Sequence, residues 1–285
     1  MAENRAMTVP PKQRLLKRLA GAAIFGVVPV LALAQSPALP HAQAATVAAA
    51  PASTMAPSAA AAAEAPAALA AADMAPRVRA CTLCHGKEGR ATPEGYFPRI
   101  AGKPAGYLAN QLFNFRDGRR NYAPMSHLLE TLSDEYLHEI AAYFAALELP
   151  YPPPPAPQAA PAQLAQGQRL VQQGDAARRL PACVQCHGSA MTGVAPAIPG
   201  LLGLPRDYLN SQLGAWQTGQ RHAQAPDCMA EVARKLSPDE VSAISAWLAA
   251  QPVPAGGKPA AQLPAPLPLR CGGVALPAAD AKGHP

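Results

Sequence analysis

The chain has 285 residues, enough for about two domains, but 34 of them are proline and only 5% are aromatic, which is little for two self-sufficient cores. The formal net charge is +6, yet the first 44 residues hold five Lys or Arg and one Glu, so the remainder carries only +2. So small an excess of positive charge gives no basis for a nucleic-acid partner.

The N-terminus has the pattern of an export signal. Four Lys or Arg residues between positions 12 and 18 precede an apolar run at 19–34, and Ala-x-Ala sequences at 32–34 and 42–44 are typical cleavage sites. The run of 16 residues is short for a membrane span and contains Pro29. We expect a signal peptide at 1–44 and a periplasmic protein. An uncleaved signal would instead anchor the chain to the membrane, and the sequence leaves that alternative open.

Segments rich in Ala and Pro divide the rest of the chain. They form a leader at 45–76, a linker at 150–161 and a C-terminal tail at 252–285. An Ala-rich helix near 59–72 is an alternative for part of the leader. Two segments remain, at 77–149 and 162–251, and we expect each to be a domain.

The two domains are repeats of one another. "GYLANQL" at 106–112 matches "DYLNSQL" at 207–213, and "TLSDEYLHEIAAYFAALE" at 131–148 matches "KLSPDEVSAISAWLAAQ" at 235–251. Because the period is a whole domain, the pattern indicates a duplication and not a solenoid.

Both repeats have helical patterns and no convincing strand alternation, which predicts an all-α fold. A middle helix is expected after Pro104 and after Pro205, ending near Gly118 and Gly219. A final helix is expected after the N-caps Ser133 and Ser237, the second with Pro238 at its first position and Glu240 in a capping box. The apolar face of these final helices comprises Ile140, Phe144 and Leu147 in the first repeat and Val241, Ile244 and Leu248 in the second.

Each repeat opens on a Cys-x-x-Cys-His sequence, "CTLCH" at 81–85 and "CVQCH" at 183–187. This is the attachment sequence of c-type haem: two thiols form thioethers with the vinyl groups, and the adjacent His becomes an axial ligand of the iron. A zinc site would need a second Cys pair nearby, and a redox Cys pair would not need the His. We therefore predict two covalent haem c groups, which also supply the missing apolar core. The expected attachment and ligand residues are Cys81, Cys84 and His85, and Cys183, Cys186 and His187.

Two methionines lie at matching places before the final helices. Met125 follows Cys81 by 44 residues, and Met229 follows Cys183 by 46. We predict that both are sixth ligands, which close the iron to substrates and favour electron transfer. The rivals His127 and His222 do not match across the repeats, and Met191 lies too close to His187 in sequence.

A proline follows each ligand His at nearly the same interval. The carbonyl group of Pro98 or Pro199 would accept the imidazole N–H and fix the ring. The alternative, an ordinary loop proline, stays open.

Two cysteines remain, Cys228 and Cys271. An even pair in an oxidising compartment predicts a disulfide. The alternatives are an intermolecular pair, or Cys228 itself as a thiolate ligand of the second haem, which would suggest sulfur-compound chemistry.

These residues together resemble the dihaem cytochrome c4 family over about 77–251. The resemblance rests on both Cys-x-x-Cys-His motifs, "YFPRIAGKPAGYLANQLFNFRDGRR" and "PMSHLLETLSDEYLHEIAAYFAAL", and their second-half counterparts. It implies two tandem class I cytochrome c domains with haems facing across an internal interface, methionine ligands at Met125 and Met229, and the carbonyl role at Pro98 and Pro199. It also implies redox protein partners at the membrane: a cytochrome bc1-type complex or dehydrogenase as donor and a terminal oxidase as acceptor.

The resemblance has departures. The leader and the tail are extra, and "FRDGRR" in the first repeat is "WQTGQR" in the second. Arg119 and Arg120 would meet haem propionates or an acidic partner patch, although a solvated helix end is the simpler interpretation.

The leading hypothesis is a periplasmic electron carrier that is not itself an enzyme. The alternatives are an electron-accepting subunit of a periplasmic dehydrogenase, and a dihaem peroxidase or thiosulfate-oxidising enzyme. The enzymes need an open axial position, which two matched methionines argue against.

Overall fold

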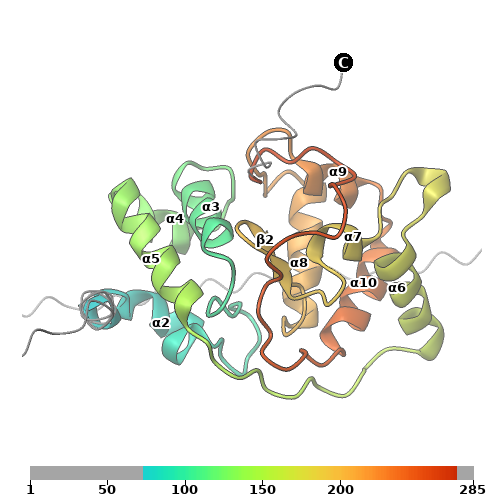
Figure 1. Cartoon of the computed structure of the whole chain (residues 1–285), viewed down its shortest axis with the longest axis horizontal. Coiled ribbons are helices and arrows are strands. Elements are labelled where there is room, and N and C mark those ends of the chain that lie inside the picture. Colours follow the sequence, from blue (N-terminus) through green and yellow to red (C-terminus); the bar gives the residue numbers. More distant parts are fainter. Residues whose placement is uncertain (1–72, 275–285) are drawn as a thin grey trace, which may run out of the picture. The chain divides into compact units, whose positions relative to one another are not determined.

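The computed structural model describes residues 73–274 (Figure 1). The expected signal peptide, the leader up to residue 72 and the last residues of the tail lie outside this described part. Within it, no helix is both long enough and apolar enough to cross a membrane.

The first repeat forms a helical group built on α3 (Ala105–Arg116) and α5 (Asp134–Ala146), which pack against each other. The shorter elements are α2 (Arg79–His85), η1 (Lys87–Gly89) and α4 (Ala123–Leu129), which packs on α3. The core between them is made of aliphatic and aromatic side chains such as Leu108, Leu137 and Phe144.

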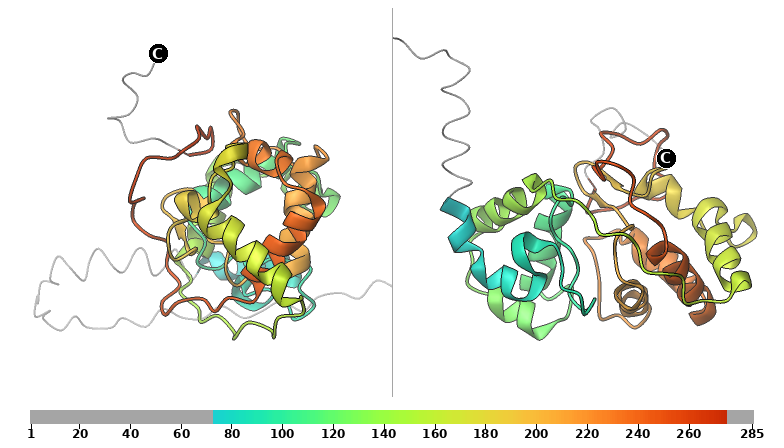
Figure 2. Two further views of the ribbon diagram at one scale, coloured as in Figure 1. Left: turned by 90° about the vertical axis from the view of Figure 1, so that its right-hand side faces the viewer. Right: turned by 90° about the horizontal axis from the view of Figure 1, so that it is seen from below.

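The second repeat forms an equivalent group around α10 (Pro238–Ala249), which packs on α6 (Pro161–Gln173) and α8 (Arg206–Gln217) (Figure 2). Its shorter elements are η2 (Ala176–Arg178), α7 (Cys183–His187) and α9 (Cys228–Arg234). Gly167 allows α6 and α10 to approach closely, since a Cβ atom there would lie 2.1 Å from the carbonyl oxygen of Ala243.

The predicted helix signals are confirmed. The Ser133 hydroxyl accepts from Tyr136 N, and Ser237 forms a capping box with Glu240, each at the start of its helix. The middle helices start after Pro104 and Pro205 and end two residues before Gly118 and Gly219, which adopt left-handed φ values of +74° and +75°. Local sequence therefore fixes both ends of these helices in both repeats.

Residues 73–77 are helical although the leader was expected to extend to residue 76, and Met74 is buried in the first core. Two more features differ from the sequence expectations. A small antiparallel sheet pairs β1 (Gly193–Val194) with β2 (Ile198–Pro199), and two-residue strands are too short to give an alternating pattern. The helix α6 begins at Pro161, so the extended linker ends one residue earlier than expected; Pro at the first turn of a helix is unstrained. Neither changes the mainly helical class.

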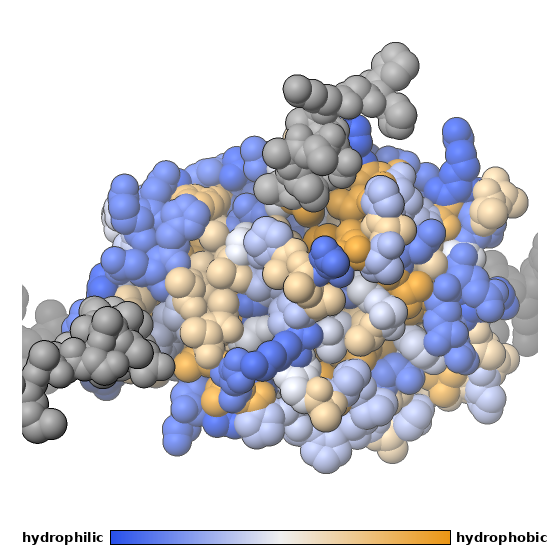
Figure 3. Space-filling view, viewed as in Figure 1, coloured by the Kyte–Doolittle hydropathy of each residue, from blue (hydrophilic) through white to orange (hydrophobic). Residues whose placement is uncertain are grey.

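The described part of the tail runs along the folded protein and is fixed to it at several points. Ala260 exchanges backbone hydrogen bonds with the β1 segment, donating to Gly193 O at 2.9 Å and accepting from Ala195 N at 2.8 Å. Further along, the Asn110 side chain of α3 donates to Gly273 O at 2.7 Å. The face drawn in Figure 3 shows hydrophilic side chains interspersed with smaller apolar areas, as expected for a surface in water.

Candidate haem-binding sites

The Cys-x-x-Cys-His sequences form the short helices α2 and α7, each of which ends on its His. The two Cys residues and the His of each motif are spaced i, i+3 and i+4, so they share one face of a short helix. Gly86 and Gly188 follow the His residues with φ values of +76° and +82°, and this backbone conformation turns the chain away directly after the predicted ligand.

Both histidines are buried and oriented by a proline carbonyl. His85 Nδ1 lies 2.8 Å from Pro98 O, and His187 Nδ1 lies 2.7 Å from Pro199 O. A carbonyl oxygen only accepts, so Nδ1 carries the proton and Nε2 keeps a free lone pair for a metal. Burial lowers the pKa of both imidazoles, which favours the neutral form that ligation requires. Pro98 and Pro199 are thus hydrogen-bond acceptors for the two histidines and not ordinary loop prolines.

The predicted haem residues line a single cavity of about 1590 Å³. Pockets for one small ligand are typically about 300–1,000 Å³, so this space suits more than one large group. The predicted residues that line it are Cys81, Cys84, His85, Pro98, Met125, Cys183, Cys186, His187, Pro199 and Met229.

The two methionines occupy equivalent places near the start of α4 and α9, and both are partly buried. The rival ligands do not line the cavity. His127 has a side chain that is 85% exposed and paired with Glu130, and His222 is also exposed. Met191 is buried in the apolar core of the second repeat. Position therefore favours the two predicted methionines.

The other uses of a Cys-x-x-Cys motif find no support in the site. In residues 73–274 no three or more His, Cys, Asp or Glu side chains gather as a metal cluster, so zinc lacks a ligand set. Burial raises the pKa of the Cys183 thiol to about 12, whereas reactive redox thiols have lowered pKa values.

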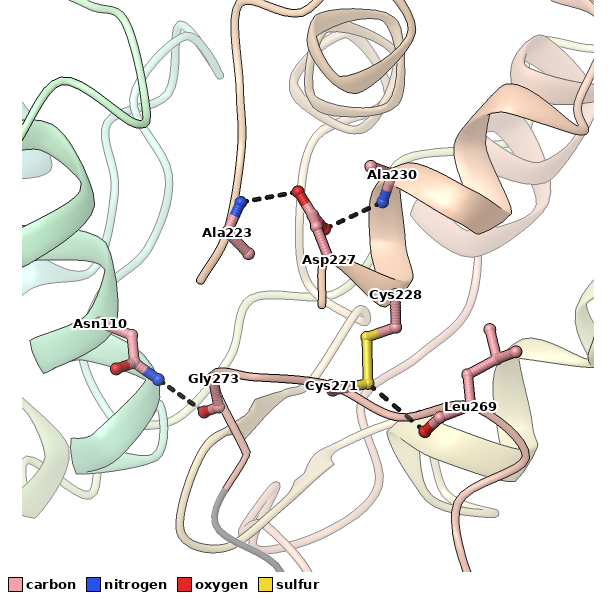
Figure 4. Close-up of a disulfide and its surroundings, with 8 residues drawn as sticks. All are labelled: Asn110, Ala223, Asp227, Cys228, Ala230, Leu269, Cys271 and Gly273. Carbon is pink, nitrogen blue, oxygen red and sulfur yellow. Dashed lines mark hydrogen bonds between the residues drawn. A yellow bond between two sulfur atoms is a disulfide. The ribbon is translucent and has the colours of Figure 1, made fainter. Parts of the chain in front are cut away.

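Cys228 and Cys271 form a disulfide with a Cα–Cα distance of 5.1 Å (Figure 4). Asp227 caps the adjacent start of α9 by accepting from Ala230 N and also accepts from Ala223 N. The tail is thus fixed beside Met229. With its sulfur in a disulfide, Cys228 has no thiolate to offer the second haem, so that alternative is wrong.

The sequence suggested that Arg120 lies at a solvated helix end, but the structure shows it buried. It is 9% exposed, and its guanidinium stacks on Phe115 and donates to Gln111, Gln212 and Tyr208. The aligned Arg221 is 5% exposed, stacks on Trp216 and donates to the same two glutamines. Arg119 is more exposed and pairs with Asp117. The sequence carries one signal for this buried cluster: Arg120 aligns with Arg221, and Gln111 aligns with Gln212.

Arg120 and Arg221 line the cavity, and the cluster contains charged and polar groups that lack a counter-ion or a hydrogen-bond partner in the described part of the chain. Burial and then the neighbouring Arg120 lower the pKa of Arg221 to about 10, because two desolvated cations lie together. The indole N–H of Trp216, which also lines the cavity, is buried without a partner in the described part of the chain. These donors fit a group that brings carboxylates into an apolar space, as haem does with its propionates.

Comparison with known proteins agrees with this chemistry. The cytochrome c family profile matches residues 164–251. The thiosulfate dehydrogenase electron acceptor of Thiomonas intermedia (strain K12) is 39% identical over 178 residues, which are 62% of this chain and 81% of the relative.

Two solved structures are similar as well. Cytochrome c4 from Pseudomonas stutzeri is 30% identical with a TM-score of 0.55, covering 62% of this chain and 96% of that one. A thiosulfate dehydrogenase from Marichromatium purpuratum is 37% identical with a TM-score of 0.55; the match covers 61% of this chain but only 36% of that one.

The helical tandem repeat, the two Cys-x-x-Cys-His motifs and these relatives lead to one conclusion: the chain belongs to the cytochrome c4 family, as an electron-transfer protein of two class I cytochrome c domains that carries two covalent haem c groups.

Proposed function

We propose that this protein is a periplasmic electron carrier in which each haem iron has a His and a Met ligand. The observation that carries the proposal is the repeated arrangement of a carbonyl-bound His and a partly buried Met on the same cavity. Haem c, once bound, supplies a one-electron iron couple, which Met ligation shifts to higher potential.

The residues of the chain hold and tune this couple. Cys81 and Cys84 would anchor the first haem, and Cys183 and Cys186 the second. The Pro98 and Pro199 carbonyls orient the ligand imidazoles through Nδ1. Met125 and Met229 would each supply the second protein ligand of one haem iron, which would leave no open site for a substrate.

We further propose that Arg120 and Arg221 hold haem propionates where the repeats meet. Both guanidiniums are buried with neutral partners, and neither forms an ion pair with an Asp or Glu in the described part of the chain. A buried cation without a counter-ion is costly, and a propionate removes that cost through charge-assisted hydrogen bonds.

The partners that fit this proposal are redox proteins at the membrane surface: a quinol-oxidising complex or dehydrogenase as donor and a terminal oxidase as acceptor. A second candidate is the electron-accepting subunit of a periplasmic dehydrogenase. The specific observation in its favour is the 39% identical relative that is named a thiosulfate dehydrogenase electron acceptor.

A spectroscopic redox titration with ligand variants tests the carrier proposal. Met-ligated ferric haem has a long-wavelength charge-transfer band, and we expect the wild-type protein to show it at two haems per chain. Met125→Ala and Met229→Ala should each remove half of its intensity, while the control His127→Ala should leave it unchanged.

A full band in either Met variant would exclude that Met as ligand. If the charge-transfer band of the wild-type protein accounted for only one haem per chain, the other iron would have an open site, which would support an enzyme instead. Purification from the native host separates the two roles of an electron acceptor, because a stable one-to-one complex with a dehydrogenase would favour the subunit.

A further inference from the structure

Lys103 belongs to the first repeat but its side chain ends in the second. The residue precedes α3 and is only 5% exposed. Its Nζ donates to Gly200 O at 3.2 Å, across 97 residues of sequence. Close by, Gly106 N donates to Pro196 O at 3.0 Å, so the start of α3 is docked on the 196–200 segment.

The segment that receives Lys103 is the one that orients the second haem's His. Gly200 directly follows Pro199, whose carbonyl oxygen lies 2.7 Å from His187 Nδ1. The pairing of β2 with β1 fixes this segment, and a Cβ atom on Gly200 would lie only 2.4 Å from Thr192 O. The ammonium group is therefore held by a rigid piece of backbone beside the carbonyl group that orients His187, the predicted ligand of the second haem.

The charge of Lys103 is not balanced by an acid. Among the described residues no Asp or Glu forms an ion pair with it, and its charged neighbour is another cation, Arg99. The ring of Tyr151 lies 5.9 Å from Nζ. Burial, followed by Arg99, lowers the pKa of Lys103 to about 8, so the ammonium form still predominates at neutral pH.

The residue of the second repeat that is equivalent to Lys103 carries no charge. In the alignment of "FPRIAGKP" at 97–104 with "IPGLLGLP" at 198–205, the partner of Lys103 is Leu204, an apolar residue of the second core. The same position is thus charged in the first repeat and apolar in the second.

We propose that Lys103 is a tuning residue through which the first domain raises the reduction potential of the second haem. A fixed positive charge disfavours ferric iron relative to ferrous iron, because the ferric form carries one more positive charge. The internal equilibrium of a one-electron-reduced protein then shifts toward an electron on the second haem. The inference rests on the proposed ligation of His187 and Met229.

Spectroelectrochemical titration of the holoprotein below the Lys103 pKa tests the inference, with the two haems distinguished by NMR of the ferric state. Lys103→Gln removes the charge but keeps a donor for Gly200 O, and Lys103→Met removes both. We expect each to shift the inter-haem equilibrium about tenfold, or 59 mV for one electron, through a fall at the second haem alone. Lys103→Arg should stay near wild type, and so should Lys258→Met, which removes an exposed cation paired with Glu148.

Unchanged potentials in Lys103→Gln, or an equal shift at both haems, would overturn the inference. If Lys103→Met disturbs folding, its charge-transfer band will be reduced, and the Gln and Arg variants decide the question. Failure of the underlying ligation proposal would appear separately, in the wild-type spectrum.

Discussion

The crossing of α6 and α10 at Gly167 provides a sharp test of the packing in the second domain. A Cβ atom at this position would lie 2.1 Å from Ala243 O and 2.9 Å from Trp247 Cβ. The nearest atom belongs to the backbone of α10, so relief requires a shift of the whole helix. Overpacking of this kind costs about 1–3 kcal/mol, and the better helix propensity of Ala returns about 0.5–1 kcal/mol.

We therefore expect Gly167→Ala to lower the free energy of unfolding by about 1–2 kcal/mol. Guanidinium denaturation of the holoprotein, followed by far-UV circular dichroism and by the Met charge-transfer band, measures it. The matched control is Gly214→Ala in α8, where nothing lies within 4 Å of the added methyl. That control should gain about 0.5–1 kcal/mol. If Gly167→Ala gained as much as the control, the close helix crossing would be refuted.

Two further predictions concern the tail and an acidic group. Replacing both Cys228 and Cys271 with Ser opens a loop with a sequence separation of 43. In the loop-entropy model this should lower the free energy of unfolding by about 4 kcal/mol, which the same denaturation measures. Free thiols at both positions in non-reducing peptide maps of the wild type would show that the disulfide is absent. Hydrogen bonding to Arg178 holds the pKa of Glu240 below its usual value, so this stabilisation is present above about pH 4.3 and is lost as the pH falls through the folded pKa. Glu240→Gln should consequently lose less stability than wild type on acidification, and parallel acid titration curves would contradict this.

Much of each domain could be predicted from local sequence. Helix ends depend on a few residues, and Ser133, Ser237 and Pro238 carried enough signal to place the starts of both final helices. At Pro98 and Pro199 the sequence left two interpretations open, a carbonyl acceptor and an ordinary loop proline, and the structure shows the hydrogen bonds. The two-residue strands of the small sheet could not be found, since a pattern needs more than one period.

The contacts between the repeats were not predictable in the same way. Arg120 has the same local sequence whether water or another domain covers it, and only the structure shows that Phe115 and two glutamines enclose it. Lys103 likewise resembles an ordinary loop lysine. Burial across an interface depends on which surfaces meet, and helix periodicity describes only the faces within one domain.

The duplication itself explains why the interface has the form it does. Arg120 and Arg221 are equivalent residues and pair with each other as an antiparallel bridge, and each donates to both Gln111 and Gln212. A self-complementary contact of this kind is what a two-fold related pair of identical domains would make. Positions that keep the symmetry therefore maintain the contact. Lys103, whose equivalent in the second repeat is the apolar Leu204, breaks the symmetry, and at such positions two haems in one duplicated protein can acquire different potentials.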